Sequence, residues 1–289
     1  MRTLHFKYGG STAGRTLQCP AWHELSKRLP VKDSGASEHA DRGTLLHDSM
    51  EEVLNSPDMP IEDCIGREFN GYVVTEDEIE DAIRPALESY IDFAEAQDFE
   101  IELPEMQVKA TDETGGTSDV IAVNIDTVFI IDWKFGFNPV SPIENPQGLF
   151  YAMCARADKS TRKLFNGRDQ LVIVIVQPMS GAALSYWETT INRLDDFEEE
   201  YYQSRAAEDV NNPVTGPDCK YCPAMAICPA KTGLARKALM MTPKSDDAKG
   251  LAGALDIADE EIEWAQTVKK LAHEQAELGL KIDGSKLVA

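Results

Sequence analysis

The stretch Val128-Phe-Ile-Ile-Asp-Trp-Lys134 decides the expected fold of this chain. Its apolar beginning indicates a buried strand, and its end carries an aspartate and a lysine. Successive side chains of a strand alternate between the two faces of a sheet. Asp132 and Lys134 are therefore expected to share one face, while Trp133 points to the other.

A second carboxylate is expected beside this pair. Asp119 stands in Gly116-Thr-Ser-Asp119-Val-Ile, at the start of the preceding strand. The two strands would bring two carboxylates and one ammonium to one edge of the sheet. Mg²⁺ and Mn²⁺ prefer such oxygen ligands and retain water molecules. A metal-bound water beside a lysine is a nucleophile suited to attack on phosphorus.

The surrounding sequence predicts an α/β fold, in which helices flank a central sheet. Thr75 begins a capping-box pattern, Thr75-Glu-Asp-Glu78, before an apolar run that ends near Phe93. The other expected helices cover 21–28, 38–55, 142–157, 194–210 and 258–278. The expected strands cover 105–110, 118–124, 127–134 and 171–177, with a turn at Gly115-Gly116 and a polar break over 245–250.

Four cysteines indicate a metal or cluster site. Cys219, Cys222 and Cys228 are spaced C-x2-C-x5-C, and Cys19 lies near the N-terminus. Three thiolates at this spacing require a fourth ligand from elsewhere, and Cys19 would join the N-terminal and C-terminal segments. The spacing does not choose between zinc and an iron–sulfur cluster. Two further cysteines, Cys64 and Cys154, lack metal-like spacing and are expected to be buried.

The composition restricts the classes of protein. The 289 residues contain no apolar run long enough for a transmembrane helix, and the N-terminus lacks a signal-peptide pattern. We expect a cytoplasmic protein without a membrane partner, whose thiols stay reduced. The net charge of −22 argues against nucleic acid as a partner. Divalent cations that bridge carboxylates to phosphates would answer that objection.

Several motifs follow one another in the order of a known superfamily: Gly43-Thr-Leu-Leu-His47, Asp119, Asp132-Trp-Lys134, Gln147-Gly-Leu-Phe-Tyr151, with Cys19 before them and the three-cysteine group after them. In this order the chain resembles the RecB-like branch of the PD-(D/E)xK nucleases. It is most similar in layout to the four-cysteine iron–sulfur exonucleases of the CRISPR-associated, AddB and Dna2 types. The resemblance covers about Cys19 to Cys228. It implies a restriction-endonuclease-like core, with a mixed sheet flanked by helices.

The resemblance also implies roles for individual residues. Metal ligands would be His47, Asp119, Asp132 and the backbone carbonyl of Trp133. Lys134 would activate the attacking water and stabilise charge on the phosphate. Gln147 and Tyr151, four apart on a helix, would steady the active site or contact the DNA backbone.

Two further acids and the cluster complete these roles. Glu51 is a weaker candidate ligand. Glu105 could be an accessory acid on the strand before Asp119, although a surface strand residue is the favoured interpretation. Cys19, Cys219, Cys222 and Cys228 would hold a 4Fe–4S cluster, with zinc as the alternative.

The function implied is a Mg²⁺- or Mn²⁺-dependent deoxyribonuclease, in replication, recombination or repair. We expect an exonuclease that prefers single strands, with residues 1–232 as the nuclease domain and 233–289 as a helical extension. No P-loop occurs, so a helicase or a single-strand-binding protein would be a separate partner. The chain resembles stand-alone phage proteins, which would place it in the host cytoplasm. A DNA-end-binding recombination factor and a cluster-dependent regulatory protein are the alternatives.

Overall fold

The computed structural model describes residues 6–29, 38–240 and 248–282, and these form two compact units. The first unit combines Met1–Ala13 with Asp33–Glu200. The second combines Gly14–Lys32 with Tyr201–Ala289. Each unit is therefore assembled from two segments, and those of the second unit lie far apart in the sequence.

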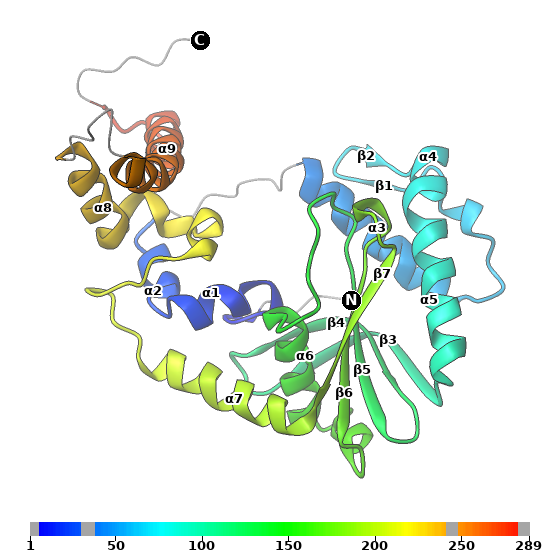
Figure 1. Cartoon of the computed structure of the whole chain (residues 1–289). Helices are drawn as coiled ribbons and strands as arrows, with labels where there is room; N and C mark the ends of the chain where they lie inside the picture. Colours follow the sequence, from blue (N-terminus) through cyan, green and yellow to red (C-terminus); the bar gives the residue numbers. More distant parts are fainter. Residues whose placement is uncertain (1–5, 30–37, 241–247, 283–289) are drawn as a thin grey trace. The chain divides into compact units, whose positions relative to one another are not determined.

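A five-stranded mixed sheet forms the centre of the first unit, in the order β3-β4-β5-β6-β7 (Figure 1). All neighbours are antiparallel except β5 and β6, which are parallel and are connected through α6. The expected α/β fold with helices beside a central sheet is confirmed. The strands are β3 (Ile101–Lys109), β4 (Gly115–Val123), β5 (Thr127–Trp133), β6 (Gln170–Val176) and β7 (Leu184–Thr190).

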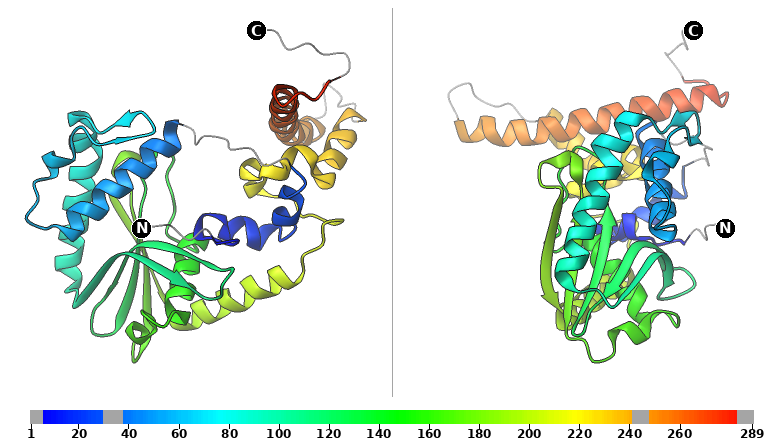
Figure 2. Two further views of the ribbon diagram at one scale, coloured as in Figure 1. Left: turned by 180° about the vertical axis from the view of Figure 1, so that it is seen from behind. Right: turned by 90° about the vertical axis from the view of Figure 1, so that its right-hand side faces the viewer.

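Helices cover both faces of this sheet (Figure 2). On one face, buried residues of α3 and α5 form a core with apolar side chains of β4, β5 and β6. On the other face, α6 contacts β3, β4, β5 and β6. The helices of this unit are α3 (Glu38–Asn55), α4 (Glu76–Glu78), a π-helical turn (Ile79–Ile83), α5 (Arg84–Gln97), α6 (Pro146–Ala157) and α7 (Ile191–Ala206), whose end enters the second unit.

Capping residues set two of the helix boundaries. Thr75 Oγ1 accepts a hydrogen bond from the Glu78 N–H, which confirms the predicted cap. The helix expected from residue 142 begins only at Pro146, because the Asn145 side chain accepts a hydrogen bond from the Gly148 N–H. Pro146 then occupies the first helical turn, where its missing N–H costs nothing.

Three strand predictions are corrected. β3 begins at Ile101 rather than at residue 105, because four more residues pair with β4. The turn expected at Gly115-Gly116 lies over residues 110–114, where the Ala110 N–H bonds to Thr114 O, and both glycines belong to β4. β7 was not predicted, because it is an edge strand with half-exposed polar residues and lacks a long apolar run.

The second unit is helical, with a small core around one of the cysteines. Cys19, Ala21, Leu25 and Ala224 are buried together. Lys231 is buried in α8 and donates to Glu260 of α9 at 2.8 Å, so the long last helix is tied to this unit. The helices are α1 (Ala13–Gln18), α2 (Trp22–Ser26), α8 (Pro229–Leu239) and α9 (Ala248–Glu277).

The last helix is longer than predicted. α9 begins at Ala248, ten residues before the expected start at residue 258, and Figure 2 shows it as one continuous helix. Residues 245–247 of the expected polar break lie outside the described residues, and 248–250 are helical. None of the described helices combines the length and the apolar content needed to cross a membrane. The division into a nuclease domain over 1–232 and an extension stays a prediction.

Gly148 provides a test of how α6 sits on the sheet. A Cβ added there would lie 2.4 Å from Ile173 Cγ2 of β6. We expect Gly148→Ala to lower the free energy of unfolding by about 1–3 kcal/mol, because a packed core has no room for the methyl group. Gly43→Ala, on α3 with no atom within 4 Å, is the matched control and should stabilise by up to about 1 kcal/mol. Denaturant unfolding measures both, and a stabilised Gly148→Ala protein contradicts this packing.

A candidate metal centre at the end of the sheet

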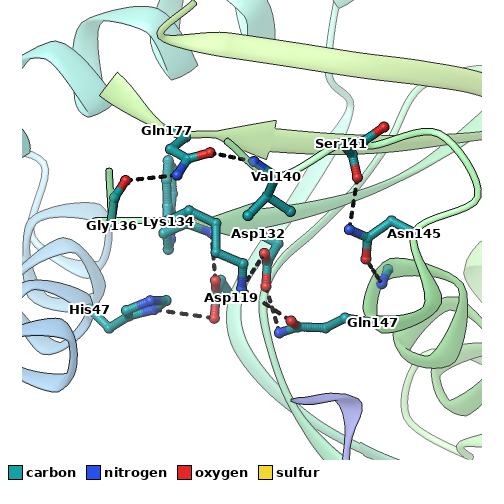
Figure 3. Close-up of polar contacts among 12 residues, drawn as sticks. His47, Asp119, Asp132, Lys134, Gly136, Val140, Ser141, Asn145, Gln147 and Gln177 are labelled. Atoms are coloured by element: carbon teal, nitrogen blue, oxygen red, sulfur yellow. Dashed lines mark hydrogen bonds and ion pairs between the residues drawn. The ribbon is translucent and has the colours of Figure 1, made fainter. Parts of the chain in front are cut away.

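Asp119 sits where the β4–β5 ladder ends. The last paired residues are Val120 and Ile131, so the next position would place Asp119 opposite Asp132. At this point a side chain replaces the backbone carbonyl as acceptor: Asp119 Oδ2 accepts a hydrogen bond from the Trp133 N–H at 2.7 Å. The opposite oxygen, Oδ1, lies 3.5 Å from Nδ1 of His47 (Figure 3).

Helix α3 and strand β3 bring two more ligand atoms to Asp119. His47 lies on α3, and Glu105 lies on β3 between the pairs Pro104–Val120 and Met106–Ser118, beside Asp119. Ligand atoms of His47, Glu105 and Asp119 all lie within 4.8 Å of one another. Elsewhere in the described part of the chain, no group of three His, Cys, Asp or Glu side chains is as close.

The position of Glu105 fits an accessory acid better than a surface strand residue. Its backbone has φ +49°, a left-handed conformation that residues other than glycine rarely adopt. The side chain is half-buried and lies in the group with His47 and Asp119. The pairing of β3 with β4 sets Glu105 opposite Asp119.

Asp132, Lys134 and Gln147 form a closed network beside this group (Figure 3). Lys134 Nζ lies 2.6 Å from Asp132 Oδ2 and donates to Gln147 Oε1 at 3.1 Å. Gln147, in the first turn of α6, donates from Nε2 to Asp132 Oδ1 at 2.8 Å. Among the described residues no well-directed hydrogen bond reaches Asp132 Oδ2, whose contact with the ammonium is an ion pair.

Burial and mutual repulsion raise the pKa values of two carboxylates of this site, Glu105 and Asp132. Burial raises the pKa of Asp132, although Lys134 opposes the shift. Burial and then the charges of Asp119 and Glu51 raise the pKa of Glu105 to about 8. Burial disfavours the charged form of His47, but Asp119 outweighs it and the pKa of His47 is raised. A cation among these groups would relieve the repulsion between the carboxylates.

Tyr151 and Trp133 support the site from the two faces of the sheet. The Tyr151 ring is buried against Gly10 and Gly116, where an added Cβ would come within 2.5 Å and 3.0 Å of it. Burial, Asp119 and Asp132 raise the pKa of the Tyr151 hydroxyl. Trp133 is fully buried with its ring edge-on to Tyr90. Its backbone, rather than its indole, faces the carboxylates.

The four predicted cysteine ligands all belong to the second unit. Cys19 and Cys228 are buried, and Cys219 and Cys222 are half-buried. Burial is the main cause that raises the pKa of the Cys19 thiol, and Cys228 and Cys219 add to the effect. Burial raises the pKa of Cys222 to about 11, with Cys219 and Cys19 among the smaller contributors. The fold thus brings the thiols from both ends of the sequence within electrostatic reach of one another.

Donors surround one of these sulfurs. The Gly216 N–H and Gln18 Nε2 lie 3.3 Å and 3.6 Å from Cys219 Sγ. Gln18 Oε1 also accepts a hydrogen bond from the Asp218 N–H. Cys64 and Cys154 are fully buried, as predicted, and lie in the first unit.

Comparisons with known proteins give a family for the whole chain. The model of the family described as "Protein of unknown function (DUF2800)" matches residues 5–289. The chain belongs to the DUF2800 family. A solved structure described as "Crystal structure of SSO0001" is 16% identical to this DUF2800 protein over 73% of this chain and 95% of that chain. The TM-score of 0.24 is too low for that similarity to carry an argument.

The raised pKa of Glu105 predicts a pH effect on stability. Because the folded state holds this proton up to about pH 8, against 4.5 ordinarily, Glu105 stabilises at low pH. That contribution is lost as pH rises toward and through about 8. In EDTA, the stability advantage of Glu105→Gln over wild type should therefore grow between about pH 5 and pH 9. Denaturant unfolding at several pH values measures it, and parallel curves for the two proteins would contradict the assignment.

Proposed function

We propose that this protein is a Mg²⁺- or Mn²⁺-dependent deoxyribonuclease with a restriction-endonuclease-like core. The observation that carries the proposal is the meeting of His47, Glu105 and Asp119 beside the Asp132–Lys134 pair. Three carboxylates, one imidazole and one ammonium converge there from α3, β3, β4 and β5. This donor set suits metal-assisted hydrolysis of a phosphodiester.

The residues present fit a hard divalent cation. Carboxylate oxygens and one imidazole nitrogen suit Mg²⁺ or Mn²⁺ better than a thiolate-seeking metal. His47, Glu105, Asp119 and Asp132 would hold the ion, together with the Trp133 carbonyl that the family resemblance suggests. The bound ion would supply Lewis-acid stabilisation of the phosphoryl oxygens and would lower the pKa of a coordinated water.

Lys134 is the group placed to act on the phosphate. Its ammonium carries the positive charge that the developing negative charge on phosphorus needs, and Asp132 and Gln147 fix its position. Water adds to phosphorus as the bond to the leaving sugar oxygen breaks; the attacking water loses its proton to solvent, and the leaving oxygen takes a proton from solvent to become a hydroxyl. Gln147 holds both Lys134 and Asp132, so we assign it a positioning role.

The finer features of the proposal rest on the family resemblance. We infer exonuclease action on single-stranded DNA ends, in replication, recombination or repair. Tyr151, buried beside Asp119, would brace the sheet end rather than contact DNA. A separate helicase or single-strand-binding protein would supply the unwound strand.

A 4Fe–4S cluster on Cys19, Cys219, Cys222 and Cys228 is the second part of the proposal. The grouping of the thiols in one unit and the two N–H donors to Cys219 Sγ support it. The spacing of the cysteines fits zinc as well as the cluster, and the family resemblance favours the cluster.

The nuclease proposal predicts metal-dependent cleavage that requires Lys134. End-labelled single-stranded and double-stranded DNA should be degraded in Mn²⁺ or Mg²⁺ and left intact in EDTA. We expect Lys134→Ala to lower kcat by about a hundred- to a thousand-fold, because one charge-stabilising donor is lost. It should retain Mn²⁺ binding by calorimetry, whereas Asp119→Ala should lose both binding and cleavage.

Lys163→Ala, which removes an exposed lysine, is the control and should cleave as the wild type does. Full activity of Lys134→Ala would disprove the site assignment. DNA binding without cleavage in any divalent metal would instead favour the non-catalytic end-binding factor.

The cluster proposal predicts a structural role separate from the chemistry. Anaerobically purified Cys222→Ala should lose bound iron and visible absorbance, and its second unit should become sensitive to protease. Cys64→Ala, which alters a buried cysteine of the first unit, should keep both. Bound zinc without iron in the wild type would replace the cluster with the zinc alternative.

A further inference from the structure

The loop that follows Lys134 is fastened by one buried amide. Gln177, at the end of β6, is only 3% exposed. Its Nε2 donates to the carbonyl of Gly136 at 2.7 Å, and its Oε1 accepts from the Val140 N–H at 2.9 Å (Figure 3). Nε2 also donates to the carbonyl of Asn138 at 2.8 Å. These three bonds hold the backbone of the loop over residues 136–140.

Arg42 of α3 fastens the start of the same loop. Its Nη1 donates to the carbonyl of Phe135 at 2.6 Å, and its Nε and Nη2 bind both oxygens of Glu78. Tyr72 also donates to Glu78. Glu78 therefore neutralises the charge of Arg42, and the loop is held by both Arg42 and Gln177.

This fixed loop presents an exposed aromatic ring next to a cavity. Phe137 is 71% exposed, although its backbone neighbours are tightly bound. It lines a cavity of about 870 Å³ together with Tyr72, Phe135, Asn138 and Met179. Phe137 is the third residue after Lys134, so their Cα atoms are at most about 11 Å apart.

We infer that this cavity is a nucleobase subsite of the proposed nuclease, with Phe137 as the stacking platform. The inference rests on the proposed function and identifies what the site recognises beside the phosphate that is cleaved. Aromatic rings are sequence-tolerant platforms for bases of single-stranded nucleic acid. An exposed ring on this hydrogen-bonded loop, within a nucleotide or two of the reacting phosphate, is in position for that contact.

The charges at the cavity favour a base over a phosphate. Asp77, Glu78 and Asp81 line the cavity, and Arg42, which also lines it, is paired with Glu78. A phosphate would meet the negative charge of Asp77 and Asp81, to which no cation in the described part of the chain is paired. A neutral base would instead bury its faces against aromatic rings and direct its N–H groups toward carboxylate oxygens.

An abasic substitution tests this inference. Single-stranded oligonucleotides with one abasic position, moved stepwise from the cleaved bond, should reveal one position at which KM of the wild type rises. Loss of one base–aromatic stack should raise KM by about 5- to 150-fold, with kcat little changed. Phe137→Ala should show the same rise on intact DNA and no further rise on the abasic strand, whereas Phe137→Trp should restore tight binding.

Ile125→Ala provides a matched control, because it also removes an exposed apolar side chain, at the turn between β4 and β5. It should leave KM unchanged. If Phe137→Ala leaves KM unchanged, or raises it equally on intact and abasic strands, the subsite is disproved. The same comparison by equilibrium binding in Ca²⁺ requires no cleavage, so a wild type without activity would overturn the proposed function while the binding data still decide the subsite.

Discussion

The hydrogen bond from the Trp133 N–H to Asp119 Oδ2 is the contact on which the site depends. Trp133 is buried, and its N–H faces β4 just beyond the last paired residues of the β4–β5 ladder. A buried backbone donor without a partner is costly, so the Asp119 carboxylate is held in this orientation. Held there, its other oxygen faces His47, and β3 places Glu105 alongside. The need of the Trp133 N–H for an acceptor thus fixes the Asp119 carboxylate, and residues of α3, β3 and β5 lie around it.

The acidity of the chain shapes the function that we propose. Several arginines of the first unit are paired: Arg156 with Asp195 and Glu198, Arg168 with Glu100, and Arg193 with Glu144. Because carboxylates already neutralise part of their charge, these arginines would bind phosphate weakly. The net charge of −22 also repels a polyanion at long range. A nuclease built this way would hold its substrate through divalent cations at the carboxylates and through stacking on Phe137. Its DNA binding would then depend more on divalent metal and less on release of monovalent counterions than that of a basic protein.

The residues that could be predicted were those that follow simple periodicities. Alternation along β5 places Asp132 and Lys134 together, and the four-residue helical spacing places Gln147 and Tyr151 on α6 near them. Glu105 could be named as a possible accessory acid, but its left-handed backbone beside Asp119 could not be predicted from strand alternation. The role of Gln177 could not be predicted, because an amide at the end of a strand has no sequence signature. Its three hydrogen-bond partners come from the loop over 136–140, whose path the sequence does not reveal. The cysteines could be grouped by spacing, but their placement in a unit separate from the carboxylates depends on how the chain ends fold together.

Anomalous diffraction from a crystal soaked in Mn²⁺ would test the central claim most directly, because it locates the metal without relying on activity. The account predicts a strong manganese peak in contact with His47, Glu105, Asp119 and Asp132. The same peak should be absent from crystals of Asp119→Ala. Manganese bound only elsewhere, or no peak in a crystal whose His47, Glu105 and Asp119 side chains are ordered, would contradict the assignment of this group as the metal centre.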